Sequence, residues 1–218
     1  MTVLTDYGLA AVGGALAVAL WIRAEGHVCR RLWAGCLLAV AVAAVAGGTW
    51  HGWAPRMARS TADALWLVTY GFIGMGNVLI LAGAAWAAAR GALRAALIGA
   101  VVLRFLVWFA FIARDPDFRY VVYDYAGTLL GLLALAVWLA WRGRPGAGWI
   151  AAGVAVSLLG AVIQAGRLAP SPAFNHNDLF HVVQAAGLYL YYRGGRVLAD
   201  AAERPPGHNG GRHPGGTS

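Results

Sequence analysis

Histidine and aspartate side chains, which can bind metal ions and transfer protons, lie close to the ends of long apolar stretches in this chain. His51 ends one such stretch, Asp63 precedes the next, and His176, Asp178 and His181 open the last one. Neutral imidazoles and carboxylates are ligand types of zinc, which in catalytic sites binds three protein groups and a water molecule. The residue types therefore predict a zinc site with His51, His176 and His181 as ligands.

The two aspartates supply the remaining chemistry of such a site. A bound zinc ion lowers the pKa of its water to about 7 and polarises a substrate carbonyl. A carboxylate that is not a ligand can accept the proton of that water or orient a histidine through a hydrogen bond. Asp63 or Asp178 is therefore the predicted catalytic acid/base.

A polar stripe begins at Asn177. Asn177, His181 and Gln184 have the i, i+4 and i+7 spacing of one helix face, and Asp178 lies three residues before His181. Polar groups are costly inside a membrane, so this stripe predicts a polar cavity and not a lipid-facing surface. Four polar residues within or next to apolar stretches are candidates for substrate binding: Arg104, Asp124, Arg167 and Gln184.

Several of these residues also have a purely structural interpretation. His51 stands beside two tryptophans, as in the aromatic belt of a membrane interface. Asp63 could be the first-turn acid of a helix, and His181 a hydrogen-bonded structural histidine. Arg104 and Asp124 could pair with each other inside the protein. The sequence leaves both interpretations open.

The elements that position these groups are seven apolar stretches. The 218-residue chain is 60% apolar and only 12% charged, which is far from the composition of a soluble domain. A helix needs roughly 20 residues, within a range of about 17 to 25, to cross the hydrocarbon layer. We predict an all-α membrane protein, a bundle of seven transmembrane helices at about 7–23, 32–52, 62–89, 93–113, 119–142, 147–167 and 177–199.

The segments between the stretches are short and polar or rich in glycine and proline. Short connections force neighbouring helices to run antiparallel. The end of the second helix, the start of the third and the start of the seventh then lie at the same membrane face, which brings the histidines and aspartates toward one region. Residues 201–218 are rich in proline, glycine and histidine and are predicted to form a disordered cytoplasmic tail.

The distribution of arginine predicts the orientation. All 17 basic residues are arginine, and with the N-terminus outside, eleven lie at the inner face and five at the outer face, with Arg104 inside a helix. The positive-inside rule therefore favours an outer N-terminus and an inner C-terminus. The net charge of +8 follows from this orientation and does not indicate nucleic-acid binding. The absence of lysine beside abundant alanine, glycine and arginine suggests a GC-rich genome and a bacterial inner membrane.

These positions resemble those of the CREST superfamily of seven-helix membrane hydrolases, which includes alkaline ceramidases and progestin/adipoQ receptors. The resemblance covers residues 7–199 and implies zinc-dependent hydrolysis. His51 matches the family's helix-2 histidine, Asp63 its helix-3 aspartate, and His181 the second histidine of its helix-7 His-x-x-x-His motif. The first histidine of that motif falls on Asn177, and the helix-2 serine falls on Gly47. The resemblance therefore leaves the third zinc ligand to His176 or Asp178.

The predicted function is a zinc-dependent integral membrane hydrolase that acts on a lipid amide or ester. Its polar cavity would lie between the second, third and seventh helices and open to the outer side. The expected partners are membrane lipid and a small-molecule or lipid substrate. Two other classes fit the same residues: a haem protein of electron transfer with His51 and His181 as axial ligands, and a non-enzymatic transporter or receptor. The sequence does not define an oligomeric state.

Overall fold

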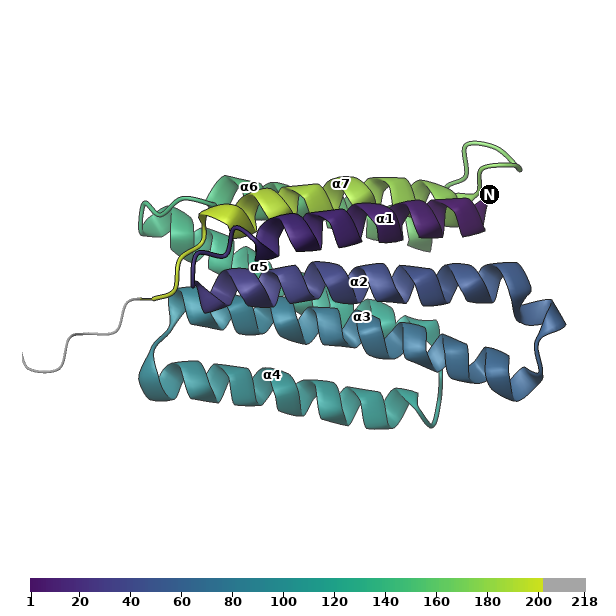
Figure 1. Ribbon diagram of the computed structural model, residues 1–218, viewed down its shortest axis with the longest axis horizontal. Coiled ribbons are helices and arrows are strands. Elements are labelled where there is room, and N and C mark those ends of the chain that lie inside the picture. Colours follow the sequence, from purple (N-terminus) through teal and green to yellow (C-terminus); the bar gives the residue numbers. More distant parts are fainter. Residues whose placement is uncertain (202–218) are drawn as a thin grey trace, which may run out of the picture.

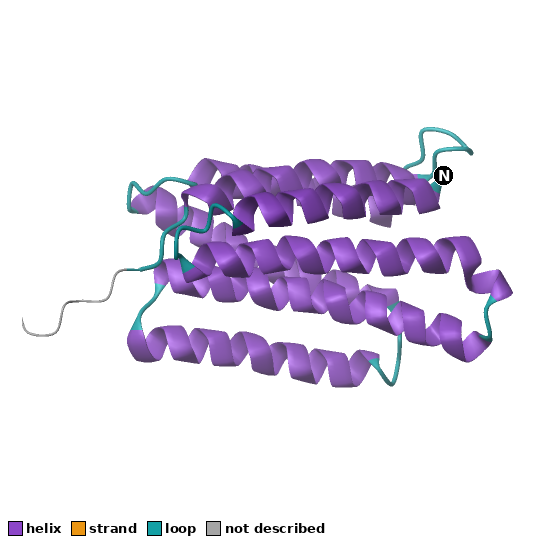
Figure 2. Cartoon of the chain, viewed as in Figure 1, coloured by secondary structure: helices purple, strands orange, loops and turns teal. Residues whose placement is uncertain are grey.

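Helices make up most of the computed structural model, which describes residues 1–201. Within this range the helices are α1 (Thr2–Trp21), α2 (Val28–Trp53), the 3-10 turn η1 (Ala54–Arg56), α3 (Arg59–Ala88), α4 (Gly91–Ile112), α5 (Phe118–Trp141), α6 (Ala147–Ala165) and α7 (His176–Val197). Figures 1 and 2 show long helices lying alongside one another, joined by short loops at the two ends of the bundle. The predicted all-helical architecture is confirmed.

Six helices of the described range, α1 to α6, are long and apolar enough to cross a membrane. The chain is therefore an integral membrane protein. The remaining helix, α7, is 22 residues long, or about 33 Å at 1.5 Å per residue. Its polar residues keep it out of the group of apolar spans, so length and composition support six spans where the sequence predicted seven.

The helices form a ring with one helix outside it. Successive pairs pack together from α1 to α4, α5 packs on α3 and α6, and α7 packs on α6 and returns to α1. Helix α4 contacts α3 at the edge of the bundle (Figure 1), and only Arg94 and Ile112 of its residues are buried. Six helices thus share the apolar core, while most of α4 faces outward.

Small residues bring the ring helices close together. Gly83 of α3 lies against the Trp33 ring of α2, where a Cβ atom would stand 2.3 Å from Trp33 Cδ1. No larger residue fits there unless the indole moves. Close approach through small residues is the usual way in which helices associate inside a membrane, where apolar burial between helices adds little.

The first helix begins at Thr2, five residues earlier than the predicted start at residue 7. The predicted range of 7–23 left residues 2–6 outside the helix. Instead, the side chains of Thr5 and Asp6 point into the bundle, where Asp6 is buried, so tertiary contacts satisfy polar groups that would otherwise end the helix. This difference places two additional polar groups next to the candidate site.

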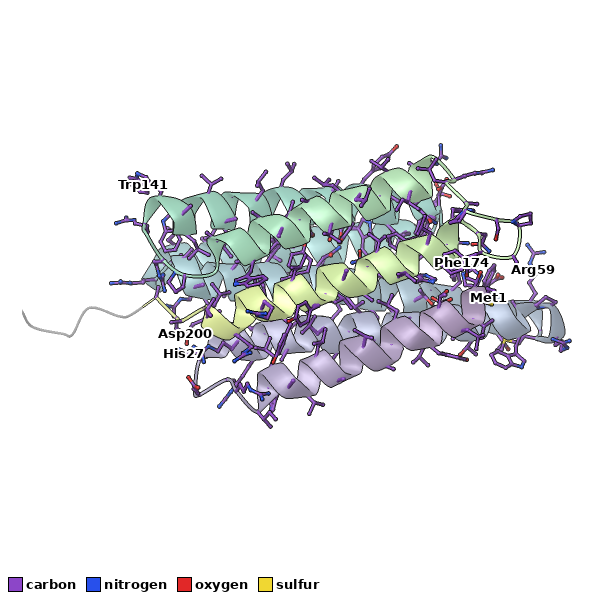
Figure 3. All side chains as sticks on the ribbon, turned by 90° about the horizontal axis from the view of Figure 1, so that it is seen from above. Met1, His27, Arg59, Trp141, Phe174 and Asp200 are labelled. Atoms are coloured by element: carbon purple, nitrogen blue, oxygen red, sulfur yellow. The ribbon has the colours of Figure 1, made fainter. Side chains whose placement is uncertain are left out.

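The bundle has two ends, which we name after residues that mark them. At the Met1 end, α1, α3, α5 and α7 begin; at the Asp200 end, α2, α4 and α6 begin. Figure 3 shows Met1 and Phe174 at one end, and Asp200 beside His27 at the other. All the predicted metal ligands lie on segments at the Met1 end.

Residues 198–201, which follow α7 and which we call the strap, lie across the Asp200 end of the bundle. Asp200 Oδ2 and Oδ1 accept hydrogen bonds from the N–H groups of Val28 (2.9 Å) and Cys29 (2.8 Å), which cap the start of α2. Three arginines from other segments donate to backbone carbonyls of this strap: Arg30 to Leu198, Arg144 to Ala199, and Arg94 to Ala201. The predicted disordered tail lies outside the described residues from 202 onward, whereas Ala201 is held by a hydrogen bond to Trp86.

Candidate functional site

An aspartate that sequence reasoning left out of the site, Asp6, lies at the centre of the polar cluster at the Met1 end. Its side chain, only 5% exposed, lies against the glycine pair of α2. A Cβ atom at Gly48 would stand 2.8 Å from Asp6 Cβ, and one at Gly47 would lie 3.8 Å from Asp6 Oδ1. Gly48 is therefore the glycine that makes room for Asp6, whereas Gly47, the position matched to the family serine, would place a Cβ atom in ordinary van der Waals contact.

His181 of α7 meets Asp6 from the opposite side. His181 Nε2 lies 3.1 Å from Asp6 Oδ1, and both side chains are nearly buried. The other ring nitrogen, Nδ1, lies 3.0 Å from the hydroxyl of Thr5, which is 3.2 Å from Asp178 Oδ1. The imidazole is thus fixed at both nitrogens, between one carboxylate and a hydroxyl that leads to a second carboxylate.

The start of α7 fixes the second carboxylate. Asn175 is the N-cap, and its side-chain oxygen accepts from the N–H groups of Asn177 and Asp178, while Asp178 Oδ2 accepts from the Asn175 N–H at 2.8 Å. This reciprocal capping box satisfies helix-start donors and leaves Oδ1 of the fully buried Asp178 for Thr5. The cap therefore positions Asp178, and through Thr5 it positions His181.

The cluster has too few protons for its acceptors. The Thr5 hydroxyl carries one proton, and three acceptors lie within reach: Thr2 O at 3.0 Å, Asp178 Oδ1 and His181 Nδ1. If Nδ1 carries the imidazole proton, Nε2 presents a lone pair to the Asp6 carboxylate. If Nε2 carries it, Thr5 must donate to Nδ1, and Asp178 Oδ1 loses its donor. In both tautomers one buried carboxylate oxygen lacks a partner.

Asp6 Oδ2 adds to this deficit, because it is buried and none of the described residues 1–201 donates a hydrogen bond to it. A buried acceptor without a donor costs on the order of 1–3 kcal/mol, and more when it is charged. Two buried carboxylates and a neutral imidazole carry excess negative charge in an apolar surrounding. The arrangement calls for a cation, either an additional proton or a metal ion.

His51, the predicted helix-2 ligand, lies near this cluster without touching it. Its ring packs edge-on against Trp50 (centroids 5.3 Å apart) and Trp66 (5.9 Å). Electrostatic interactions link it to His181 and to Asp178. His51 therefore combines the two interpretations open at the sequence level, because it packs in an aromatic cluster and also lies within range of the other imidazole.

The other predicted ligand and the first predicted acid/base residue lie farther from the cluster. His176 is the first residue of α7 and is partly buried, and within residues 1–201 no hydrogen bond or ion pair joins it to Asp6 or His181. The Asp63 side chain is 73% exposed and forms an i, i+4 pair with Arg59 at 3.8 Å. Among the described residues no group of three His, Cys, Asp or Glu side chains is arranged to hold a metal ion. The zinc site stays a prediction.

The polar stripe of α7 divides between two neighbours. Asp178 and His181 face α1, as described above. Asn177 accepts a hydrogen bond from Gln164 of α6 at 2.8 Å, and Gln184 donates to the Tyr125 hydroxyl of α5 at 3.1 Å. The stripe therefore lines no single cavity, and Gln184, a predicted substrate-binding residue, is buried between helices.

The remaining predicted substrate-binding residues lie apart from the cluster. Arg104 and Asp124 form the ion pair that the sequence allowed, with Nη2 and Oδ1 3.1 Å apart. They join α4 to α5, whereas the cluster lies among α1, α2 and α7. Arg167 is exposed just after α6, in a left-handed backbone conformation (φ 48°).

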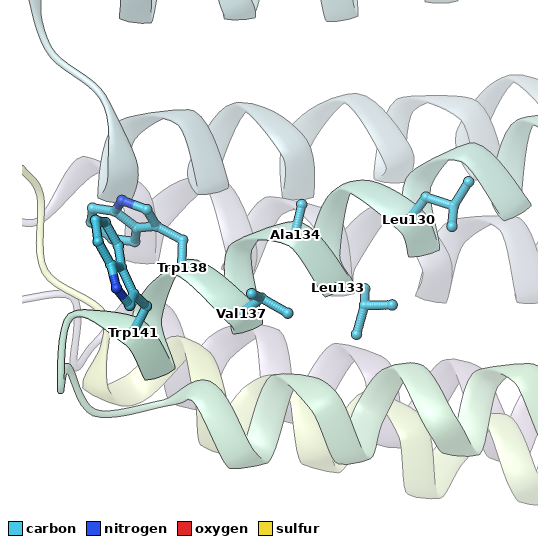
Figure 4. Close-up of a pocket in the computed structure, with 6 residues that line it drawn as sticks. All are labelled: Leu130, Leu133, Ala134, Val137, Trp138 and Trp141. Atoms are coloured by element: carbon cyan, nitrogen blue, oxygen red, sulfur yellow. The ribbon is translucent and has the colours of Figure 1, made fainter.

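Further along α5 the outer surface carries an apolar depression of about 520 Å³ (Figure 4). It is lined by Leu130, Leu133, Ala134, Val137, Trp138 and Trp141. Figure 4 shows the two indoles next to each other at one end of the row. The residues that line the depression include no titratable group.

Thr5 and Asp6 are the site residues that sequence reasoning missed. Their signal was present: an acid occurs next to a long apolar segment, where a charge is costly unless it has a partner. The sequence gave no reason to join this acid to a histidine 175 residues away, because the helix was expected to begin after it. The contact between α1 and α7 supplies that link.

Comparison with family models shows that the chain belongs to the Family of unknown function (DUF6962), whose model matches residues 1–200. The match covers all seven helices and the strap that follows α7. Comparisons with curated proteins and with solved structures gave no match.

Proposed function

We propose that this protein is a membrane-embedded, zinc-dependent hydrolase of a lipid ester or amide, with its reaction centre at Asp6 and His181. The observation that carries the proposal is the buried contact between a carboxylate and an imidazole in a cluster with more acceptors than hydrogen-bond donors among the described residues. Zinc is a cation that takes both ligand types. The resemblance to the CREST superfamily supports the same reaction class.

The donor atoms suit such an ion. Two ligands of one tetrahedral zinc ion, each about 2.0–2.1 Å from it, lie roughly 3.3 Å apart, and His181 Nε2 lies 3.1 Å from Asp6 Oδ1. We propose Asp6 and His181 as two ligands and His51, which lies near them without touching them, as the third once its ring moves toward the ion. This set replaces His176 by Asp6, because Asp6 contacts His181 and His176 does not. Bound there, zinc would supply an activated water and polarise a carbonyl.

The other residues of the cluster orient these groups. The Asp178–Thr5 chain holds the His181 ring with its Nδ1 toward Thr5, which directs Nε2 to Asp6. The second oxygen of Asp6, to which none of residues 1–201 donates a hydrogen bond, could accept a proton from a reacting water. Hydrogen-bonded carboxylates behind a ligand histidine typically change metal affinity or activity by about 10- to 100-fold.

We also propose that α7 crosses the membrane as a seventh span, with the Met1 end outside, in a bacterial inner membrane. The packing of α7 against both α1 and α6 supports the seventh span. Arginine-rich segments at the Asp200 end support the orientation. Labelling of single cysteines introduced at residues 57 and 144 of a cysteine-free variant, in intact cells, tests it: the first should react with an impermeant maleimide and the second should not.

A second candidate function follows if the cation that balances the buried carboxylates is a proton. The cluster would then be the proton-binding site of a non-enzymatic transporter or receptor, with the proton shared between Asp6 and His181. The same geometry accommodates a proton or a zinc ion, so measurements of bound zinc and of lipid hydrolysis separate the two functions.

The decisive experiment measures zinc by elemental analysis and hydrolysis of fluorescent lipid esters and amides on the purified full chain. We expect about one zinc per chain and detectable hydrolysis, both lost in Asp6→Asn and His181→Ala. Asp63→Asn, the same chemical change at an exposed position, is the matched control and should retain both. His176→Ala should also retain both. Metal-free protein without hydrolytic activity overturns the hydrolase, and zinc loss in His176→Ala restores the ligand set implied by the resemblance.

A further inference from the structure

Arg193 and Arg196, near the end of α7, carry positive charge that no carboxylate among residues 1–201 balances. The carboxylates at the Asp200 end are those of Glu25, which pairs with Arg30 at 2.8 Å, and of Asp200, which caps α2. The i, i+3 spacing of the two α7 arginines places both charges on one side of the helix, where like charges repel each other. We call these two residues the arginine pair.

The guanidinium of Arg193 is held against aromatic rings. Its Cζ atom lies 4.1 Å from the ring centroid of Trp149 of α6 and 5.8 Å from that of Tyr189. Within residues 1–201 its one side-chain hydrogen bond runs from Nη1 to the Tyr189 hydroxyl at 3.0 Å. Because a guanidinium has five N–H donors in one plane, the stacked group keeps donors in the fork geometry that suits a phosphate.

The arginine pair lies at the level of the membrane interface. Trp149 is the third residue of α6, which is long and apolar enough to cross a membrane. A Cβ atom at Gly194 would stand 3.6 Å from Trp149 Cβ, so this part of α7 lies level with the first turn of α6, about 3 Å from its start. Tryptophan and tyrosine mark the boundary between headgroups and hydrocarbon, and arginine side chains extend from it toward the headgroups.

The same face of α7 becomes apolar toward the middle of the helix. Val182, Ala186 and Tyr189 are exposed and continue the line of the arginine pair with spacings of three or four residues. These residues face away from the bundle, whereas the buried residues of α7, such as Leu188 and Tyr191, pack inside it. The outward face thus has the polarity of a phospholipid, with an apolar length that ends in a charged group.

We infer that the arginine pair and Trp149 bind the headgroup of an anionic phospholipid, with its acyl chains along the outward face of α7 at Ala186 and Val182. The negative charge of such a headgroup relieves the repulsion within the pair. A zwitterionic headgroup brings its own cation and gains less there. Since Arg193 belongs to α7 and Trp149 to α6, the bound headgroup would also join these two helices.

The test compares the lipids that the purified full chain retains in native mass spectrometry. Phosphatidylglycerol and phosphatidylcholine with identical acyl chains are offered at equal concentration. We expect phosphatidylglycerol to be retained about tenfold more, which is equivalent to about 1.4 kcal/mol, because basic residues at the membrane surface favour anionic lipids by this order. The double variant Arg193→Gln with Arg196→Gln should retain both lipids equally.

A second double variant, Arg31→Gln with Arg90→Gln, is the matched control. It removes two exposed arginines from the same end of the bundle, one on α2 and one before α4, and should preserve the preference for phosphatidylglycerol. Inorganic phosphate added as a competitor should not displace the lipid, because it has no acyl chain to contact α7. The wild-type ratio decides the question even if a variant does not fold.

The proposal is overturned if wild type retains both lipids equally, or if the two double variants lose the preference to the same extent, which would indicate attraction by the overall surface charge. Displacement by inorganic phosphate would overturn it in favour of a free anion. The preference should persist in Asp6→Asn, and its loss there would place the lipid at the Met1 end. These outcomes involve neither zinc nor hydrolysis, so the inference is independent of the proposed function.

Discussion

Two aspartates at opposite ends of the bundle are held in opposite ways. At the Asp200 end, both oxygens of Asp200 accept backbone hydrogen bonds at the start of α2. At the Met1 end, Asp6 is more deeply buried, yet no described residue donates a hydrogen bond to Oδ2, and Oδ1 faces the imidazole ring of His181. The first carboxylate completes the structure, whereas the second remains available for a cation. A buried carboxylate oxygen without a donor costs stability, so the Met1 end is held less favourably than the Asp200 end.

The sharpest way to break this comparison is to replace each carboxylate by the isosteric amide. Asp6→Asn removes the charge and lets the amide donate to His181 Nε2, so the metal-free protein should be as stable as wild type or up to about 1 kcal/mol more stable. Zinc content and lipid hydrolysis should fall at least about 100-fold. Unfolding in detergent and elemental analysis measure the two effects. Loss of stability with retained activity would contradict the functional role of Asp6.

Thr5→Val sharpens the comparison within the Met1 end. Valine keeps the shape of threonine but breaks the link between Asp178 and His181. We expect zinc affinity and hydrolysis to fall by about 10-fold, the lower part of the range for groups that orient a metal ligand. Thr49→Val, which removes a hydroxyl that contacts Tyr7 and not the cluster, is the control. Equal effects of the two changes would show that Thr5 only stabilises the fold.

Asp200→Asn tests the Asp200 end, where the same substitution should have the opposite consequence. Losing the charged cap of α2 should destabilise the protein by about 1–2 kcal/mol at neutral pH, the usual range for a capping residue. Activity measured well below the unfolding temperature should not change. A stability equal to wild type would remove the contrast between the two ends.

The pH dependence of that difference follows from the pKa of Asp200. Burial by itself would raise this pKa, but the hydrogen bonds donated by Cys29 and Val28 outweigh it and keep the pKa below the ordinary value of 3.8. A folded-state pKa below the unfolded value gives stability that is present above pH 3.8 and is lost as the pH falls through the folded pKa. The stability difference between wild type and Asp200→Asn should therefore be constant from pH 5 upward and shrink below about pH 4.

Asp63→Asn should have the smallest effect. The carboxylate is exposed, and its pair with Arg59 at 3.8 Å is a surface ion pair of the kind that contributes at most about 0.5 kcal/mol in a helix. Unfolding, zinc content and hydrolysis should all match wild type. A large loss of activity would return Asp63 to the catalytic role that the sequence predicted.

The helices could be predicted from the sequence, because the length of an uninterrupted apolar run is a local property. Long uncharged runs separated by glycine, proline and charge allow few alternatives to helices that cross a membrane, and the predicted ranges for α3 to α7 end within a few residues of those observed. The clustering of His51 and His181 at one end follows from alternating helix direction. The Arg104–Asp124 pair could also be inferred from the sequence, since an isolated charge in an apolar run needs a partner.

Only the tertiary structure decided which polar groups meet. Asp6 and Asp63 are both acids at the edge of an apolar stretch, and nothing local distinguishes them. Close packing of α1 on α2 at Gly48 and its contact with α7 bury Asp6 against His181, whereas Asp63 stays on the surface. A side chain's partners depend on which helix faces pack together, and that choice arises from the shape of the whole bundle and not from any one segment.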